Sequence, residues 1–282
     1  MTNTMAFQLL KLLRWNNLLI VMITQYAIAY FLIDSMIFQE LLFNPKMLVL
    51  SISTVFIAAA GYLINDYYDI KIDYVNKPQR VVVGRFLKRR SIIILHATLN
   101  TLGIAGGFWV SWELGTINLI ASGLLWLYSN QLKRLPFIGN LTVAFLTGLS
   151  VVVVYILFRE SIFLIGVYAV FAFYISLIRE IIKDMEDVEG DKKFDCKTLP
   201  IIIGIRNSKM IIYLIILLFI LSVIALLQQE PKFWWILSGL TVILTLLGFR
   251  LYTADKNIDF TNLSKWSKQI MILGLLSLVF FK

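Results

Sequence analysis

Long runs of apolar residues recur along the whole chain, and they constrain its fold more than any other feature. Each run is about 17–25 residues long, the length that an α-helix needs to cross a lipid bilayer. The 282 residues are 59 % hydrophobic and have a mean hydropathy of +0.82, which is too apolar for a soluble domain. The sequence therefore predicts an all-α membrane protein in which residues 1–282 form one intramembrane domain.

The apolar runs predict about nine transmembrane helices in a single bundle. The first run is long and no small-residue cleavage site follows it, so we expect a retained span rather than a signal peptide. The fourth and ninth runs are the shortest. The predicted spans are residues 15–35, 46–64, 91–111, 114–130, 139–158, 161–180, 209–228, 233–252 and 267–281.

Nine spans divide the positive charges unevenly between the two sides of the membrane. If the N-terminus is cytoplasmic, the outer side holds only four of the 26 Lys and Arg, namely Lys46, Arg159, Lys232 and Lys282. Cytoplasmic loops of membrane proteins carry an excess of Lys and Arg. We therefore interpret the net charge of +9 as membrane topology and not as nucleic-acid binding, and we place the two long loops in the cytoplasm.

Two acidic clusters stand at the polar ends of the second and sixth apolar runs. On a helix that turns about 100° per residue, the members of each cluster share one face. Oxygen ligands without His or Cys suit a hard cation such as Mg²⁺, which binds one or two carboxylates and phosphate oxygens. Two such faces brought together predict two Mg²⁺ sites that hold a diphosphate. The metal-ligand candidates are Asn65, Asp66, Asp69 and Asp73, and then Asp184, Asp187 and Asp191.

The surroundings of the two clusters bear on this interpretation. Glu186 and Glu189 point away from the second acidic face, and Gly190 is placed to break the helix before Asp191. The alternative is that the acids are solvated helix ends with salt-bridging charges, but two matching clusters at the same membrane level disfavour it.

The single Cys196 excludes an intrachain disulfide, and we expect the lone His96 to be a packed, hydrogen-bonded residue. Cations beside the acids are Lys71, Lys77, Arg80, Lys183 and Lys192.

Both clusters resemble signatures of the UbiA superfamily of intramembrane prenyltransferases. The first reads Asn65-Asp66-x-x-Asp69-x-x-x-Asp73, followed by Asn76-x-Pro78-x-Arg80. The second reads Lys183-Asp184-x-x-Asp187-x-Glu189-Gly190-Asp191-Lys192, followed by Thr198-Leu199-Pro200. The likeness covers nearly the whole chain, including Tyr128-Ser129-x-x-Leu132-Lys133 and Gly139-Asn140. It departs at Arg14-Trp15-Asn16-Asn17, where the family often has Arg-Pro-x-Asn.

The resemblance implies a helical bundle around a central cavity with a cytoplasmic cap, in which Mg²⁺ holds a polyprenyl diphosphate. Positive charge stabilises the departing diphosphate, an acceptor attacks the allylic carbon, and aromatic faces stabilise the developing cation. The implied catalytic residues are Asp69, Asp187, Tyr128 and Lys133. The implied substrate-binding residues are Asn17, Lys77, Arg80, Tyr128, Ser129, Lys133, Lys183 and Lys192.

Several acceptor classes remain open. Residues 179–191 and 139–148 are most similar to the digeranylgeranylglyceryl phosphate synthase branch, which implies geranylgeranyl transfer to the hydroxyl of geranylgeranylglyceryl phosphate. Cations suited to such an acceptor are Lys192, Lys193, Lys197 and Arg206. The alternatives are an aromatic acceptor such as 4-hydroxybenzoate or a naphthoate, a UbiA-type terpene cyclase, and a cation or lipid-diphosphate transporter. Short, nearly uncharged outer turns disfavour the transporter.

Overall fold

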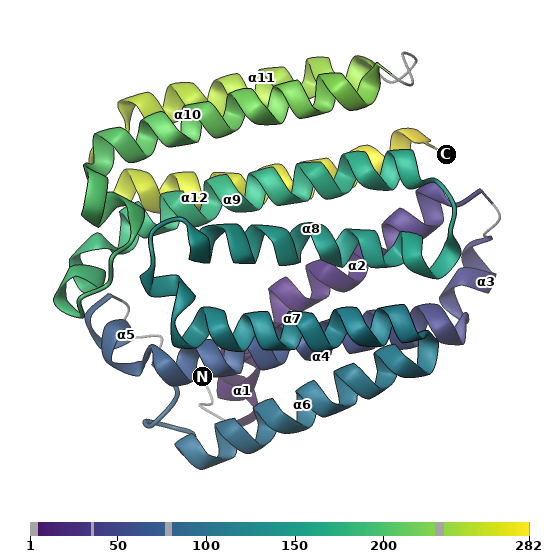
Figure 1. Cartoon of the computed structure of the whole chain (residues 1–282), viewed down its shortest axis with the longest axis horizontal. Helices are drawn as coiled ribbons and strands as arrows, with labels where there is room; N and C mark the ends of the chain where they lie inside the picture. The colour runs from purple at the N-terminus through teal and green to yellow at the C-terminus, as the bar shows by residue number, and fades with distance from the viewer. Residues whose placement is uncertain (1–4, 35–36, 77–80, 229–233, 282) are drawn as a thin grey trace. The chain divides into compact units, whose positions relative to one another are not determined.

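The computed structural model describes residues 5–34, 37–76, 81–228 and 234–281, and within these ranges it contains helices but no strand longer than one isolated bridge. Figure 1 shows the path of the chain. The α-helices are α1 (Met5–Leu12), α2 (Trp15–Leu32), α3 (Phe38–Leu42), α4 (Pro45–Tyr68), α5 (Ile70–Asn76), α6 (Arg89–Val110), α7 (Trp112–Asn130), α8 (Ile138–Phe158), α9 (Ile162–Lys193), α10 (Leu199–Leu227), α11 (Trp234–Thr253) and α12 (Asn257–Leu276).

Nine long helices in the described ranges correspond one to one with the nine predicted spans. Eight of these helices are long and apolar enough to cross a membrane, and α7, the predicted fourth span, is the long helix that does not meet both criteria. The all-α membrane fold predicted from the sequence is thus confirmed.

Four helices are longer than the apolar runs indicated: α4 continues to Tyr68, and three others extend further. Helix α9 continues to Lys193, α10 begins at Leu199, and α12 begins at Asn257. The apolar spans stop short of these ends because hydropathy detects only the part of a helix that is apolar enough for lipid, whereas a helix continues wherever its backbone hydrogen bonds do. The helical path through the second acidic cluster, which its shared face had assumed, is confirmed. Pro200 stands in the first turn of α10, where a missing N–H costs nothing.

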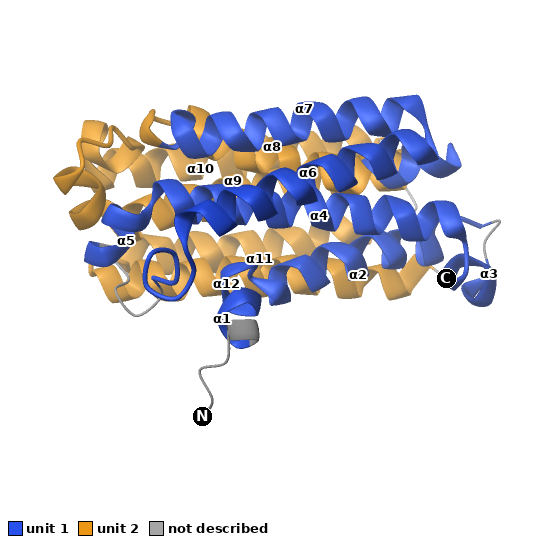
Figure 2. Cartoon of the chain, turned by 90° about the horizontal axis from the view of Figure 1, so that it is seen from below, with its two compact units in different colours: residues 1–133, 153–160 blue, residues 134–152, 161–282 orange. Residues whose placement is uncertain are grey.

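The chain divides into two compact units, coloured separately in Figure 2. Unit 1 comprises residues 1–133 and 153–160, and unit 2 comprises residues 134–152 and 161–282. The first acidic cluster belongs to unit 1 and the second belongs to unit 2, so each is described within its own unit.

In unit 1, helix α4 packs against α2, α6 and α7. Gly103 permits the close approach of α6, because a Cβ atom added there would lie 3.0 Å from the main-chain oxygen of Ser53. The fully buried Gln25 accepts a hydrogen bond from Ser51 and donates one to Thr54, which connects α2 to α4. Small residues and interhelical hydrogen bonds of this kind hold helices together in lipid.

In unit 2, helix α9 lies beside α12, and α10 lies beside α11 (Figure 1). The stacked rings of Tyr174 and Phe219, 4.9 Å apart, belong to the apolar core of this unit. At the loop between α11 and α12, Lys209 of α10 donates to the carbonyl of Ala254, and the Asn257 side chain donates to the carbonyl of Glu186 at 2.6 Å. The Asn257 contact joins the start of α12 to the C-terminal part of α9, where the second acidic cluster lies.

Candidate active site

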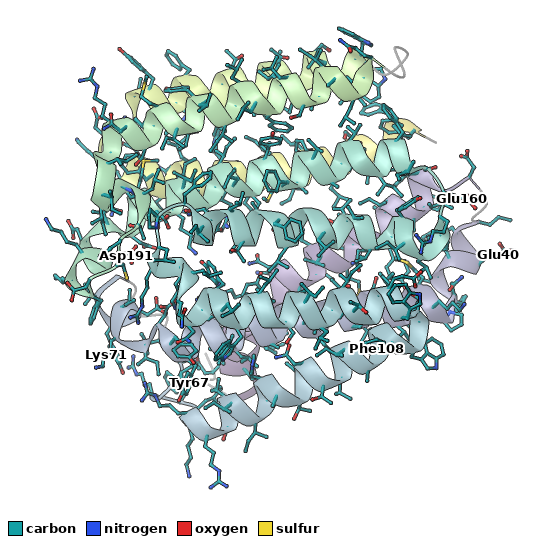
Figure 3. The ribbon with its side chains drawn as sticks, in the orientation of Figure 1. Glu40, Tyr67, Lys71, Phe108, Glu160 and Asp191 are labelled. Carbon is teal, nitrogen blue, oxygen red and sulfur yellow. The ribbon has the colours of Figure 1, made fainter. Side chains whose placement is uncertain are left out.

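The first acidic cluster follows a nearly continuous helical path from α4 into α5. Asp69 caps α4, and its N–H donates to the carbonyl of Asn65 at 2.9 Å. The N–H of Asp73 in turn donates to the carbonyl of Asp69 at 2.8 Å. The predicted helical spacing of these side chains is therefore confirmed, with a local break at Asp69. In Figure 3, Tyr67 and Lys71 mark this end of unit 1.

Two cations from distant parts of unit 1 pair with this cluster. The Nζ of Lys133 lies 2.5 Å from an oxygen of Asp69, and the two side chains are only 10 % and 15 % exposed. The Nη2 of Arg14 lies 2.8 Å from an oxygen of Asp66. Both carboxylates of the first cluster are thus held in place by cations that lie far away along the chain.

Arg14 is a site residue that the sequence reasoning left without a role. Its guanidinium lies over the ring of Tyr62, 4.7 Å from the centroid, and the Tyr62 hydroxyl accepts a hydrogen bond from Asn17 at 3.4 Å. Arg14 and Asn17 thus support the same corner of unit 1, beside Asp66. The available signal was the Arg-x-x-Asn spacing, in which only Asn17 had been assigned to substrate binding.

The second acidic cluster lies on the last turns of α9. Asp184 accepts a hydrogen bond from the side chain of Asn140 at 2.7 Å, and Asp191 is labelled at the C-terminal end of α9 in Figure 3. The expectation that Gly190 breaks the helix is wrong, since α9 continues to Lys193. A single helical glycine costs only about 1 kcal/mol relative to alanine, and Gly190 is buried within α9.

The donor atoms present suit Mg²⁺, although no three His, Cys, Asp or Glu side chains among the described residues converge into a ready-made metal group. The side-chain oxygen of Asn65 is buried and has no hydrogen-bond partner in the described part of the chain. Buried polar atoms normally have partners. Asn65 lies one helical turn before Asp69, and an amide oxygen and a carboxylate are both donors that a hard cation accepts, so these residues fit Mg²⁺.

The other predicted site residues have diverse surroundings. Ser129 is buried and donates to the carbonyl of Leu125 within α7, beside the half-buried Tyr128. Lys183 has its Nζ 3.8 Å from Glu180, and Lys192 is exposed on the last turn of α9. Two predicted substrate-binding cations, Lys77 and Arg80, lie outside the described residues.

His96 has the packed, hydrogen-bonded environment that the sequence predicted. Its Nδ1 lies 2.9 Å from the carbonyl oxygen of Ala60, and its ring also contacts the side-chain amide of Asn100. One ring nitrogen is thereby engaged with the backbone of α4, which gives His96 a structural role in joining α6 to α4.

Comparisons with known proteins agree with this arrangement. The model of the UbiA prenyltransferase family matches residues 18–267. A digeranylgeranylglyceryl phosphate synthase from Methanosphaera stadtmanae is 33 % identical over 247 residues, which is 85 % of this chain and 88 % of that one. Another, from Thermococcus gammatolerans, is 41 % identical over 164 residues, or 58 % and 59 % of the two chains.

Solved structures show the same fold. A structure from work on digeranylgeranylglyceryl phosphate synthase in membranes has a TM-score of 0.72 and 25 % identity, and the match covers 98 % of this chain and 97 % of that one. A UbiA homologue from Archaeoglobus fulgidus bound to GPP and Mg²⁺ has a TM-score of 0.68 and 17 % identity, covering 96 % and 99 %. The chain therefore belongs to the UbiA prenyltransferase family.

Proposed function

We propose that this chain is a Mg²⁺-dependent prenyltransferase that transfers a geranylgeranyl group from its diphosphate to the hydroxyl of geranylgeranylglyceryl phosphate. The observation that carries the choice of acceptor is the 33 % identity to the Methanosphaera stadtmanae digeranylgeranylglyceryl phosphate synthase over 85 % of the chain. The bond between the allylic carbon and the diphosphate oxygen breaks, an ether bond forms to the acceptor oxygen, and the hydroxyl proton is released.

Each acidic cluster is proposed to bind Mg²⁺. When bound, the ion supplies positive charge that stabilises the leaving diphosphate. The unpaired oxygen of Asn65 and the carboxylates already paired with Arg14 and Lys133 support this role for the first cluster. The proposed ligands are Asn65, Asp66, Asp69 and Asp73 in the first cluster, and Asp184, Asp187 and Asp191 in the second.

Other side chains are proposed to bind and orient the donor. Lys133 brings a positive charge to Asp69, where a diphosphate bound through Mg²⁺ also needs charge neutralisation. Tyr128 presents an aromatic face that is suited to an allylic cation, next to the buried Ser129. Further diphosphate contacts are assigned to Asn17, Lys77, Arg80 and Lys192.

The enzyme class is tested by incubating the purified chain with Mg²⁺, labelled geranylgeranyl diphosphate and several acceptors. Diphosphate release together with a doubly prenylated glyceryl phosphate is the expected result. A prenylated 4-hydroxybenzoate or naphthoate would replace the proposed acceptor, a cyclic hydrocarbon or alcohol would indicate a cyclase, and intact donor in every arm would refute prenyl transfer.

The N-terminus and the α4–α5 end of unit 1 are proposed to face the cytoplasm, a view supported by the distribution of Lys and Arg. Lys71 and Glu40 lie at opposite ends of unit 1 (Figure 3), and both are exposed. In a Cys196→Ser background, a cysteine at position 71 should react with impermeant reagents only from the cytoplasm, and one at position 40 only from outside. Labelling of both from one side would refute this topology.

A further inference from the structure

Within unit 2, a small cavity lies where α11 ends and α12 begins, and its volume is about 130 Å³. The polar part of its lining consists of Arg250, Thr253, Asp259, Asn262 and Trp266. Both helices are long and apolar enough to cross a membrane, and Arg250 stands in the last turn of α11. This α11–α12 cavity therefore lies near a polar end of two spans, and it contains none of the residues proposed to bind Mg²⁺ or the substrates.

Arg250 is the one cation among the described residues that line this cavity. Its guanidinium carbon lies over the ring of Trp266, 4.5 Å from the centroid. The described part of the chain supplies no carboxylate within ion-pair distance and no hydrogen-bond acceptor for its N–H groups. A guanidinium presents its N–H donors in a fork that matches a phosphate group. Because Trp266 covers a face of the guanidinium, the fork at its edge stays open to an anion.

Asp259 and Asn262 indicate what else the ligand carries besides negative charge. The Oδ2 of Asp259 accepts hydrogen bonds from the main-chain N–H groups of Asp255 and Lys256, at 3.1 and 2.9 Å. Its Oδ1 and the side-chain amide of Asn262 have no hydrogen-bond partner among the described residues. A carboxylate oxygen accepts a hydrogen bond from a hydroxyl but repels a second anion. The cavity therefore suits a phosphate at Arg250 with hydroxyl groups beside it.

An apolar stripe on α11 leads to the cavity. Val242, Leu246 and Phe249 are exposed large hydrophobic residues. On a helix that turns about 100° per residue, these three side chains and Thr253 lie within an arc of about 60°. An exposed apolar stripe on a membrane-length helix faces lipid chains. A lipid whose chains lie along this stripe therefore brings its headgroup to Thr253 and Arg250.

We propose that the α11–α12 cavity binds a membrane phospholipid whose phosphate carries a hydroxylated headgroup. The phosphate binds Arg250, and the headgroup hydroxyls bind Asp259 and Asn262. Because the ligand contacts the end of α11 and the start of α12, it stabilises the packing of these two helices. The alternative is that Arg250 only extends its charge to water at the membrane surface. That alternative predicts no preference among headgroups, which the following measurements test.

The first test measures how far added lipid raises the melting temperature of the purified full chain in a neutral detergent. A ligand that binds the native state stabilises it. Phosphatidylglycerol, which has a phosphate and headgroup hydroxyls, should act at a lower concentration than phosphatidylcholine, which has no headgroup hydroxyl. Equal responses to the two lipids would overturn the proposal, because the chain would then bind phospholipid without distinguishing the headgroup.

Variants of Arg250 locate this response. Arg250→Gln should raise the half-saturating concentration of phosphatidylglycerol about tenfold or more. Arg250→Lys should recover only part of the affinity, because an ammonium group lacks the fork of donors. Each response is measured against the lipid-free sample of the same variant, because losing the cation–π contact with Trp266 lowers the melting temperature by itself.

Arg90→Gln is the matched control, since Arg90 is an exposed arginine in the first turn of another membrane-length helix, α6. It should respond to phosphatidylglycerol as wild type does. A half-saturating concentration for Arg250→Gln within about twofold of wild type would overturn the proposal. A loss of the same size in Arg90→Gln would also overturn it, because the response would then follow net charge and not the cavity.

Asn262→Ala tests the contacts with the headgroup hydroxyls. It should weaken the response to phosphatidylglycerol and leave the response to phosphatidylcholine unchanged, because only the former lipid carries these hydroxyls. Equal losses for the two lipids would overturn the assignment of hydroxyl groups to this part of the cavity.

The last test separates a membrane lipid from a soluble phosphate. Glycerol 3-phosphate carries the same kinds of polar group without acyl chains. At the concentration at which phosphatidylglycerol half-saturates its effect, glycerol 3-phosphate should leave the melting temperature unchanged, because contacts along the stripe of α11 supply part of the binding. Equal stabilisation by glycerol 3-phosphate at that concentration would overturn the proposal, since the cavity would then bind a soluble phosphate.

Discussion

Replacing Lys133 by glutamine tests the role of the cation that the tertiary structure brings to the first acidic cluster. The Nζ of Lys133 lies 2.5 Å from Asp69, and both side chains are largely buried. A charge-assisted hydrogen bond in such a setting contributes about 1.5–3 kcal/mol. Lys133 is expected to stabilise the departing diphosphate in the transition state by a similar free energy. Each 1.36 kcal/mol of such stabilisation corresponds to a tenfold change in rate. We therefore expect Lys133→Gln to lower kcat/KM for the donor about 10- to 100-fold.

The Mg²⁺ dependence separates a catalytic role of Lys133 from a purely structural one. Lys133 competes with a metal ion for Asp69, so Lys133→Gln should need no more Mg²⁺ than wild type, whereas Asp69→Asn should need far more. In EDTA, Lys133→Gln leaves Asp69 without this partner, and its melting temperature should fall; added Mg²⁺ should restore it, since a ligand that binds the native state stabilises it.

The assay measures donor turnover at saturating acceptor over a series of Mg²⁺ concentrations, together with thermal unfolding in detergent. Arg134→Gln is the matched control, since Arg134 is the adjacent cation and is exposed; it should behave as wild type. A Lys133→Gln protein with donor kcat/KM within about twofold of wild type would refute the reasoning, and so would a Mg²⁺ requirement that rises as steeply as that of Asp69→Asn.

Three further predictions concern unit 2. Asp187→Ala should abolish turnover at saturating Mg²⁺ while the protein still inserts and elutes as a folded species; near-normal turnover would contradict metal binding by the second cluster. Asp184→Asn should reduce the rate severely and Glu186→Gln only mildly, because only Asp184 lies on the acidic face. A higher Mg²⁺ requirement for Glu186→Gln than for Asp184→Asn would show that the acidic face of the second cluster is assigned wrongly. Gly148→Val should lower the melting temperature, since an added Cβ lies 3.1 Å from a main-chain oxygen of α9, whereas Gly166→Ala, with nothing within 4 Å, should not.

Much of the fold and of the candidate site was predictable from local properties of the sequence. Apolar length predicted the nine long helices, because the cost of placing polar groups in lipid acts on each segment separately. The i, i+4 spacing of Asn65 and Asp69 likewise predicted their shared helical turn, which the hydrogen bond between their backbones confirms. The assignment of these residues as metal ligands stays a prediction.

Helix ends were less predictable than helix number. The apolar run that ends at residue 180 continues as helix to Lys193, and this extension carries the whole second acidic cluster. Hydropathy cannot detect this extension, because a helix can continue past the membrane surface into charged residues, which hydropathy does not count as membrane-spanning.

The partners of the acidic residues were decided by the tertiary structure alone. Asp66 pairs with Arg14 across 52 positions, Asp69 with Lys133 across 64, and Asp184 with Asn140 across 44. No periodicity relates residues so far apart, since only helices that pack side by side bring them within hydrogen-bonding distance. The sequence by itself therefore determined where the acidic clusters stand and predicted that they carry the chemistry, while helix packing determined which cation or amide holds each carboxylate, because ion pairs form through space and not along the chain.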